Sequence, residues 1–298
     1  MTGLSIILAL GAYSLLAFNG VADKFLLSKV VRHPIAYAFY TGITGPLVWV
    51  LAPFGLIFLS WENFVVALIG GAWFPVALYF FDRAIQQTSI SRILPIEGGL
   101  VPLFTLGFAY LILGERLASS QLLAFVFLVF GAILISFRYE RGQWHAKAFG
   151  NALIAAVLFA LSAVVTKYIF DQSNFVSGLI WTRLGFFLAS VSFLISPKAR
   201  GYIFNTPKKV STGNKLLYYS TRLTGAASGF MQNYAVAIGS VTIVNALQGT
   251  QFAVLLILTS VLSVWFPKIL KEKISVLIIV QKIAAMLVIS FGLYLLTV

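Results

Sequence analysis

One carboxylate of the chain, Glu97, lies inside an apolar stretch that is long enough to cross a lipid bilayer. The surrounding residues, ILPIEGGLVPL from Ile93 to Leu103, place it between two prolines and beside two glycines. A charge at the centre of a membrane helix costs at least about 2.5 to 3.5 kcal/mol on insertion scales, so it requires a partner, water or a function. Glu97 is therefore a candidate for proton coupling or for binding a substrate amine. The alternative is a structural ion pair, for instance with Arg222.

Three cations occupy other apolar stretches, namely Arg183, Arg222 and Lys282. An arginine presents a planar fork of donors that matches a carboxylate or a phosphate. Arg183, about 12 Å into its stretch at 1.5 Å per residue, could bind such a group, clamp backbone carbonyls or extend to the interface. Arg222 has the same alternatives, and the long stem of Lys282 can reach the headgroups. Because cations outnumber Glu97 in this set, the pattern favours an anionic or zwitterionic ligand.

Uncharged polar side chains extend the candidate site. Asn245, Gln248 and Gln251 recur at i, i+3 and i+6, close to one face of a helix, and Asn233 lies in the preceding stretch. Such residues either line a cavity or hydrogen-bond between helices, where the average contribution is only about 0.6 kcal/mol. Tyr40 and Thr44 mark a similar polar face near the N-terminus, for which aromatic packing is the alternative. The predicted binding or coupling set is Glu97, Arg183, Arg222, Asn233, Asn245, Gln248, Gln251, Tyr40 and Thr44.

The residue types disfavour catalytic chemistry. The chain has no cysteine and two histidines, which excludes thiolate sites and disfavours zinc. It also lacks a P-loop, an HExxH motif and a GxSxG motif. We therefore expect no enzyme activity, no metal and no cofactor. The net charge of +13 resides mainly in loops, where anionic headgroups and membrane topology account for it without nucleic acid.

The elements that carry these residues are predicted to be membrane helices. Of the 298 residues, 60% are hydrophobic and 10% are charged, with a mean hydropathy of +0.97. Windows of about 20 apolar residues predict an all-α membrane protein with ten transmembrane helices. The expected spans are 3–22, 34–59, 63–81, 91–113, 117–137, 148–166, 175–195, 216–236, 241–266 and 274–298.

The two halves of the chain resemble each other. Residues 13–26, YSLLAFNGVADKFL, align with 156–169, AVLFALSAVVTKYI, and residues 84–98 align with 235–249, pairing Glu97 with Gln248. LGERLA at 113–118 aligns with LKEKIS at 270–275. We predict five-helix repeats at 1–140 and 148–298, joined by a linker at 141–147. An odd number of crossings inverts the second repeat, an arrangement that places a substrate site near the midplane between the repeats.

The order of these motifs resembles the drug/metabolite transporter superfamily, EamA type. A basic residue ends the first helix of each half, and Gly-Glu or Lys-Glu separates the fourth and fifth helices. The resemblance implies that helices one to four and six to nine surround a central cavity, with the fifth and tenth peripheral. It also implies export or exchange of small metabolites without ATP.

The sequence thus favours a secondary transporter that moves a small polar metabolite by alternating access of the inverted repeats. Amino acids, organic acids and sugar nucleotides remain open as substrates, as do proton or ion coupling, membrane lipids as partners and a homodimer. The alternative is a lipid-handling or scaffold protein whose intramembrane charges are structural. No targeting peptide is visible, so we expect a multi-pass protein of a prokaryotic plasma membrane.

The membrane orientation is ambiguous. Most loop Lys and Arg residues lie in the odd-numbered loops, whereas the even-numbered loops contain Arg116 and Lys167. The positive-inside rule then places the odd loops in the cytoplasm and both termini outside. Resemblance to the EamA type implies the opposite orientation, with both termini inside.

Overall fold

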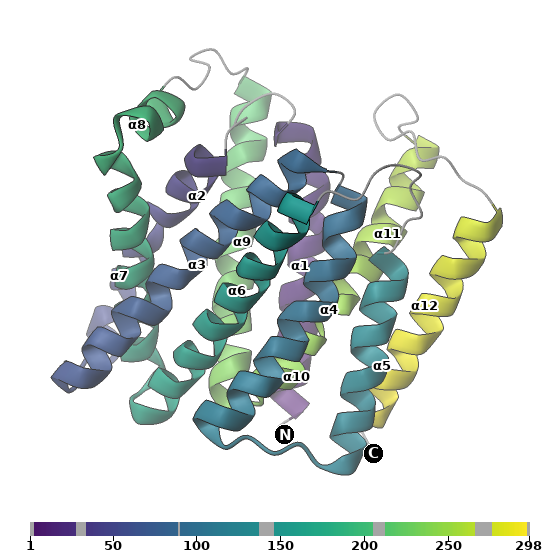
Figure 1. Ribbon diagram of the computed structural model, residues 1–298, viewed down its shortest axis with the longest axis horizontal. Helices are drawn as coiled ribbons and strands as arrows, with labels where there is room; N and C mark the ends of the chain where they lie inside the picture. The colour runs from purple at the N-terminus through teal and green to yellow at the C-terminus, as the bar shows by residue number, and fades with distance from the viewer. Residues whose placement is uncertain are drawn as a thin grey trace.

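The computed structural model describes residues 3–27, 34–88, 90–136, 146–204, 212–265 and 276–296, and the regular secondary structure of this part of the chain is entirely helical (Figure 1). Residues 137–145, which include most of the predicted linker, lie outside the described residues, as do Ser89 and the 270–275 copy of the LGERLA motif. The elements in chain order are α1 (Gly3–Leu27), α2 (Pro34–Gly42), η1 (Gly45–Phe54), α3 (Trp61–Gln87), α4 (Ile90–Phe108), η2 (Ala109–Leu113), α5 (Ser119–Ser136), α6 (Ala146–Gln172), α7 (Phe175–Ser192), η3 (Phe193–Ile195), α8 (Pro197–Phe204), α9 (Thr212–Ile238), α10 (Val241–Ala246), α11 (Gln248–Trp265) and α12 (Val276–Leu295).

Each of the ten expected ranges contains one or two of these elements, and α8 is a short additional helix. Within the described residues, eight segments are long and apolar enough to cross a membrane. They are Gly3–Gly20, Ile35–Phe54, Trp61–Gln87, Arg92–Leu113, Ser119–Ser136, Ala146–Gln172, Phe175–Ile195 and Val241–Thr259. The chain is therefore an integral, multi-pass membrane protein.

Four of the expected spans change helix type or divide, and in one of them, 175–195, the change is only the closing 3-10 turn η3. The range 34–59 changes from α2 to the 3-10 helix η1, which has Pro46 in its first turn and Pro53 inside it. The range 91–113 ends in the π-helical turn η2, and 241–266 divides into α10 and α11 at Leu247. Proline has no amide proton and collides with the preceding turn, which explains the first interruption. Irregular backbone at membrane depth is tolerated only inside protein or beside water.

Polar caps and glycines define several helix ends. Ser60 caps α3 by accepting from the Asn63 amide, and Asn174 caps α7 by accepting from the Ser177 amide. The segments η1 and η2 both end at a glycine with positive φ, Gly55 at 117° and Gly114 at 66°. A left-handed residue is the usual way to end a helix, and glycine adopts that conformation without steric cost.

The helices form two packed groups and a peripheral pair (Figure 1). Helix α3 packs along α6 and α7, and α1 packs along α9 and α11. Helices α5 and α12 pack against each other at one edge of the molecule. The strongest close approach joins α3 to α7, where a Cβ added at Gly71 or Gly185 would overlap backbone atoms of the other helix. Small residues allow such contacts between membrane helices.

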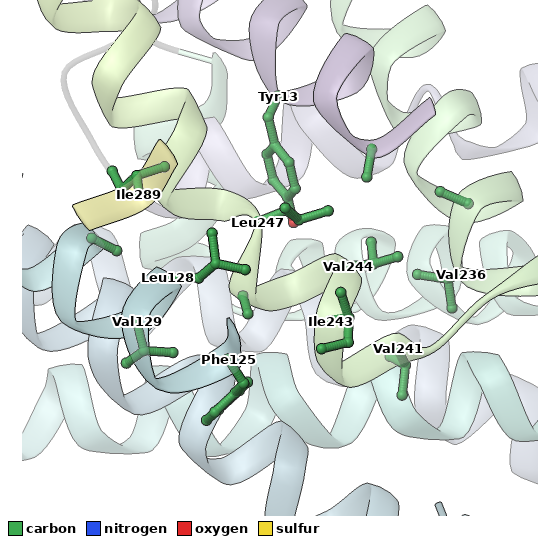
Figure 2. Packing of buried hydrophobic residues seen from close by; sticks show 14 of the residues in the cluster. Tyr13, Phe125, Leu128, Val129, Val236, Val241, Ile243, Val244, Leu247 and Ile289 are labelled. Carbon is green, nitrogen blue, oxygen red and sulfur yellow. The ribbon is translucent and has the colours of Figure 1, made fainter. Parts of the chain in front are cut away.

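The largest apolar cluster lies around the short helix α10 (Figure 2). Its buried members include Val241, Ile243, Val244 and Leu247, which meet Leu128 and other residues of α5. At the start of α10, the Ser240 hydroxyl donates to the Glu115 carboxylate and accepts from the Ile243 amide. Glu115, in the loop before α5, therefore connects the first half of the chain to the second.

Candidate functional site

Glu97 is buried in α4, with a relative exposure of 4%. Its Oε2 atom has no hydrogen-bond partner, and the same is true of the buried Oδ2 atom of Asp82 on α3. Phe81 of α3 and Ile96 of α4, the neighbours of Asp82 and Glu97 in the sequence, pack against the same apolar cluster, which places the two carboxylates on adjoining parts of these helices. Pro102 lies on α4 after Glu97 and cannot donate to the carbonyl four residues before it. Two carboxyl groups with unsatisfied buried oxygens thus lie near each other between α3 and α4.

Glu97 does not pair with Arg222, the ion pair that the sequence offered as an alternative. The ion pair found within the described residues joins Lys167 to Asp171 at 2.8 Å, and Glu97 forms none. The guanidinium of Arg222 lies over the ring of Tyr37 on α2, with 5.7 Å from Cζ to the ring centroid. Arg222 therefore connects α9 to α2 rather than neutralising Glu97.

Arg183 lies on α7 and points toward α9. A Cβ added at Gly229 of α9 would be 3.5 Å from Nη2 of Arg183, and Cζ lies 5.3 Å from the ring centroid of Phe186. Within the described residues its guanidinium has neither a hydrogen bond nor an ion pair. The amide of Asn233 donates to the Gly229 carbonyl at 2.7 Å, so Arg183 and Asn233 meet at the same residue of α9. A guanidinium placed in this way retains its donors for a ligand.

The polar stripe on α10 and α11 divides into two kinds of residue. Asn245 is buried and donates from Nδ2 to Oγ1 of Thr105 on α4 at 3.0 Å, so it bonds one helix to another. Gln248 and Gln251 are partly buried, and their side chains make no hydrogen bond within the described residues. These two glutamines keep amide groups available near the break between α10 and α11.

Tyr40 and Thr44 do not extend this site. The Tyr40 hydroxyl donates to the Ile203 carbonyl of α8 at 2.9 Å, and its ring packs edge-on against Phe39. Thr44 is exposed and donates to the Thr41 carbonyl at 2.7 Å in the turn before η1. Both hydroxyl groups are used in hydrogen bonds to nearby backbone, so this face fits the alternative in which its residues serve packing.

The candidate residues lie in two separate polar regions, one around Arg183 and one around Asp82 and Glu97. Helices α3 and α7 pack in parallel: Phe64 contacts Trp181 at one end, and Phe74 contacts Phe186 further along. Arg183 is therefore level with Gly71 to Phe74 on α3. Asp82 lies two turns beyond Phe74, or about 12 Å at 1.5 Å per residue.

Asp82 is not among the residues predicted from the sequence, because the expected span 63–81 ends one residue before it. Helix α3 continues to Gln87, so Asp82 is inside a membrane-length helix. The local sequence YFFDRA contains the signal, since an aspartate directly follows three aromatic residues. Extending the span by one turn would have placed Asp82 inside a predicted membrane helix.

Comparisons with known proteins agree with this architecture. Residues 3–137 match the model of the EamA-like transporter family. A crystal structure of a protein of unstated function superposes with a TM-score of 0.69 at 16% identity, covering 99% of this chain and 95% of that one. At this identity the superposition shows the shared fold. No curated protein matches the chain. The resemblance to EamA-type transporters is confirmed over residues 3–137.

Proposed function

From the premise that residues 3–137 carry the EamA-like transporter pattern, we propose that the chain is a secondary transporter for a small anionic or zwitterionic metabolite. The observation that carries the substrate class is the Arg183 guanidinium, which lies beside Gly229 of α9 without a protein hydrogen bond or ion pair among the described residues. An amino acid, an organic acid or a sugar nucleotide offers the carboxylate or phosphate that this fork would hold. The proposed location is a prokaryotic plasma membrane.

Ten spans in two inverted five-helix repeats are part of the proposal. Helix contacts support the repeats, because each contact between the halves has a counterpart when the corresponding helices of the two halves are interchanged. The first helix of each half packs on the third helix of the other, as α1 on α9 and α6 on α3. Each first helix also packs on the fourth segment of the other half, as α1 on α11 and α6 on α4, while α5 meets α12.

Aligned residues make matching contacts as well. Asn19 of α1 and Ser162 of α6 occupy the same position in the alignment of 13–26 with 156–169. Asn19 accepts a hydrogen bond from Thr224 of α9, and Ser162 donates to the Gly70 carbonyl of α3 at 2.7 Å. Both bonds join the first helix of one half to the third helix of the other. These contacts support repeats at 1–140 and 148–298.

One pair of corresponding contacts between the proposed repeats differs in how closely it is packed. Helix α3 packs tightly on α7, whereas the corresponding pair, α9 and α2, has little backbone contact among the described residues. The side-chain contact of Arg222 with Tyr37 lies between those two helices. An alternating-access transporter at rest is closed on one side and open on the other, so this inequality supports a rocking mechanism.

The experiment that tests this proposal is ligand-induced thermal stabilisation of the purified protein in detergent. The panel contains glutamate, succinate, inorganic phosphate, a sugar nucleotide and a lipophilic cation. A ligand at a hundred times its Kd stabilises the folded state by about 2.7 kcal/mol. We expect at least one anionic compound to stabilise the wild type, Arg183→Ala to lose that response, and Arg183→Lys to retain part of it.

The matched control is Arg116→Ala, because Arg116 is exposed in the loop before α5. This variant is expected to respond like the wild type. Counterflow of the stabilising compound in proteoliposomes then separates transport from simple binding. If Arg183→Ala lowers the melting temperature of the ligand-free protein but every compound stabilises it as in the wild type, Arg183 is structural. The substrate class proposed from Arg183 would then be overturned, and absence of counterflow as well would favour the alternative of a non-transporting scaffold.

A further inference from the structure

Asp82 and Glu97 form the second polar region, which anion binding at Arg183 does not explain. Glu97 is 4% exposed, and one carboxyl oxygen of each residue is buried without a hydrogen-bond partner. Leaving a buried carboxylate without hydrogen bonds or a counterion is costly, and a second carboxylate nearby raises that cost through repulsion. The arrangement is stable only if something positive occupies it.

The surrounding helices do not supply that charge. On α3, the exposed Arg83 donates to the Tyr79 hydroxyl at 2.9 Å, and its guanidinium lies over that ring. On α6, the nearby Lys147 is exposed, and Asn151 donates to Gln87 at 2.9 Å. Helices α5 and α10 contain no titratable side chain. Arg92 of α4 is five residues before Glu97, and thus about 140° around the helix from it.

We propose that Asp82 and Glu97 together hold one exchangeable proton, and that this proton is the coupling ion of the transporter. The proposal of coupling rests on the proposed transport function, whereas the proton site itself does not. In each cycle one H⁺ is taken from water on one side of the membrane, which reduces the charge of the pair from two negative units to one. The same H⁺ is later released to water on the other side.

The location of the pair suits this role. Helix α3 carries Asp82 and packs tightly on α7, which carries Arg183. This tightly packed pair of helices therefore connects the two polar regions. A change in charge at Asp82 and Glu97 would alter how α3 sits against α4, and therefore the position of Arg183 relative to α9. Coupling of this kind requires a shared element with two arrangements rather than direct contact.

Infrared difference spectroscopy of the protein in liposomes tests the proton site without any substrate. The observable is the C=O stretch of a protonated carboxyl group, recorded in potassium buffer at a series of pH values. We expect a band in the wild type that disappears as the pH is raised. Glu97→Gln should lose the band, Asp82→Asn should shift its titration, and Glu62→Gln should leave it unchanged.

The outcomes separate the proposals. Absence of a titrating band in the wild type overturns the proton site, and a thermal stabilisation by NaCl over KCl that Glu97→Gln abolishes would assign the pair to Na⁺ instead. If Glu97→Gln does not elute as a monodisperse peak, Asp82→Asn and the wild-type titration still decide. Coupling is then tested by proton movement in pyranine-loaded liposomes on addition of glutamate, succinate or phosphate. Net uptake of the compound without proton movement overturns the coupling and leaves transport standing, whereas a titrating band without any flux rejects transport alone.

Discussion

The polar side chains inside the helices of the described chain differ in whether another helix satisfies them. Asn245 donates to Thr105, and Ser162 donates to the Gly70 carbonyl, so both are used in packing. Arg183 makes no such bond, and Glu97 retains an unsatisfied oxygen. An unsatisfied buried polar atom is costly and calls for an explanation, which gives Glu97 priority as a binding group. Arg183 has priority for another reason, since its guanidinium makes no hydrogen bond or ion pair within the described residues and lies beside Gly229 of α9. Asn245 belongs instead with the structural residues.

A double-mutant cycle measures that structural role. We expect Asn245→Ala and Thr105→Val to be coupled by about 0.6 kcal/mol, the average for hydrogen bonds between membrane helices, and by no more than about 1.7 kcal/mol. The coupling is read from reversible unfolding of the two single variants and the double variant. Ligand-induced stabilisation should be retained in all three. If the Asn245→Ala variant lost its ligand response but kept its stability, Asn245 would be a binding residue.

The sequence predicted the identity of the central charges better than their partners. Hydropathy isolates Glu97 and Arg183 because a charge is rare in an apolar window. Hydropathy contains no information about which helix lies opposite, and the ion pair of Glu97 with Arg222, offered as the alternative to a functional role, is not found among the described residues. Tyr40 was selected for its polar hydroxyl, but that hydroxyl reaches α8, a short helix that apolar windows do not predict.

At the level of elements, the contact between α3 and α7 is the tightest feature of the fold. A Cβ at Gly71 would overlap the Thr182 carbonyl, and one at Gly185 would overlap the backbone of Leu68. Overpacking of a well-packed contact costs about 1 to 3 kcal/mol. We expect Gly71→Ala to lower the unfolding free energy by about this amount and to weaken transport, since this contact joins Arg183 to α3.

Gly150→Ala on α6 is the matched control for that substitution. Nothing lies within 4 Å of a Cβ added at Gly150, and alanine is the better helix former. This variant should therefore unfold at the same temperature as the wild type or slightly above it. Thermal unfolding followed by circular dichroism compares the two, and equal stability of both variants would show that α3 and α7 can separate easily.

Helix positions followed from hydropathy, whereas the interruptions of the helices did not. Apolar windows report length, so 241–266 was expected as one span. The break at Leu247 depends on packing, because buried residues of α10 fill the space between α5 and the helices of the other group (Figure 2). Tertiary contacts of that kind are invisible in a single sequence, and the same holds for the π-helical turn before Gly114.

On the scale of the whole molecule, charge is distributed unequally between the two ends of the bundle. Helix α1 begins and α12 ends at the same end, and α8 lies at the opposite end (Figure 1). The end with α8 carries most of the described Lys and Arg residues outside the apolar helix interiors, namely Arg83, Arg92, Lys147, Lys198 and Arg200. At the other end, Lys167 is paired with Asp171, and Arg116 lies in the loop before α5.

The positive-inside rule then predicts that α8 faces the cytoplasm and that the chain ends face outward. The absence of cysteine makes this directly measurable, because any thiol introduced is the sole labelling site. We expect a membrane-impermeant maleimide to label Ser120→Cys, at the start of α5, in intact cells. Lys198→Cys on α8 should react only after the cells are opened. Both side chains are exposed, so access depends on the side of the membrane and not on burial. The reverse labelling pattern would show that the orientation implied by the EamA resemblance overrides the charge bias, and that α8 lies outside the cell.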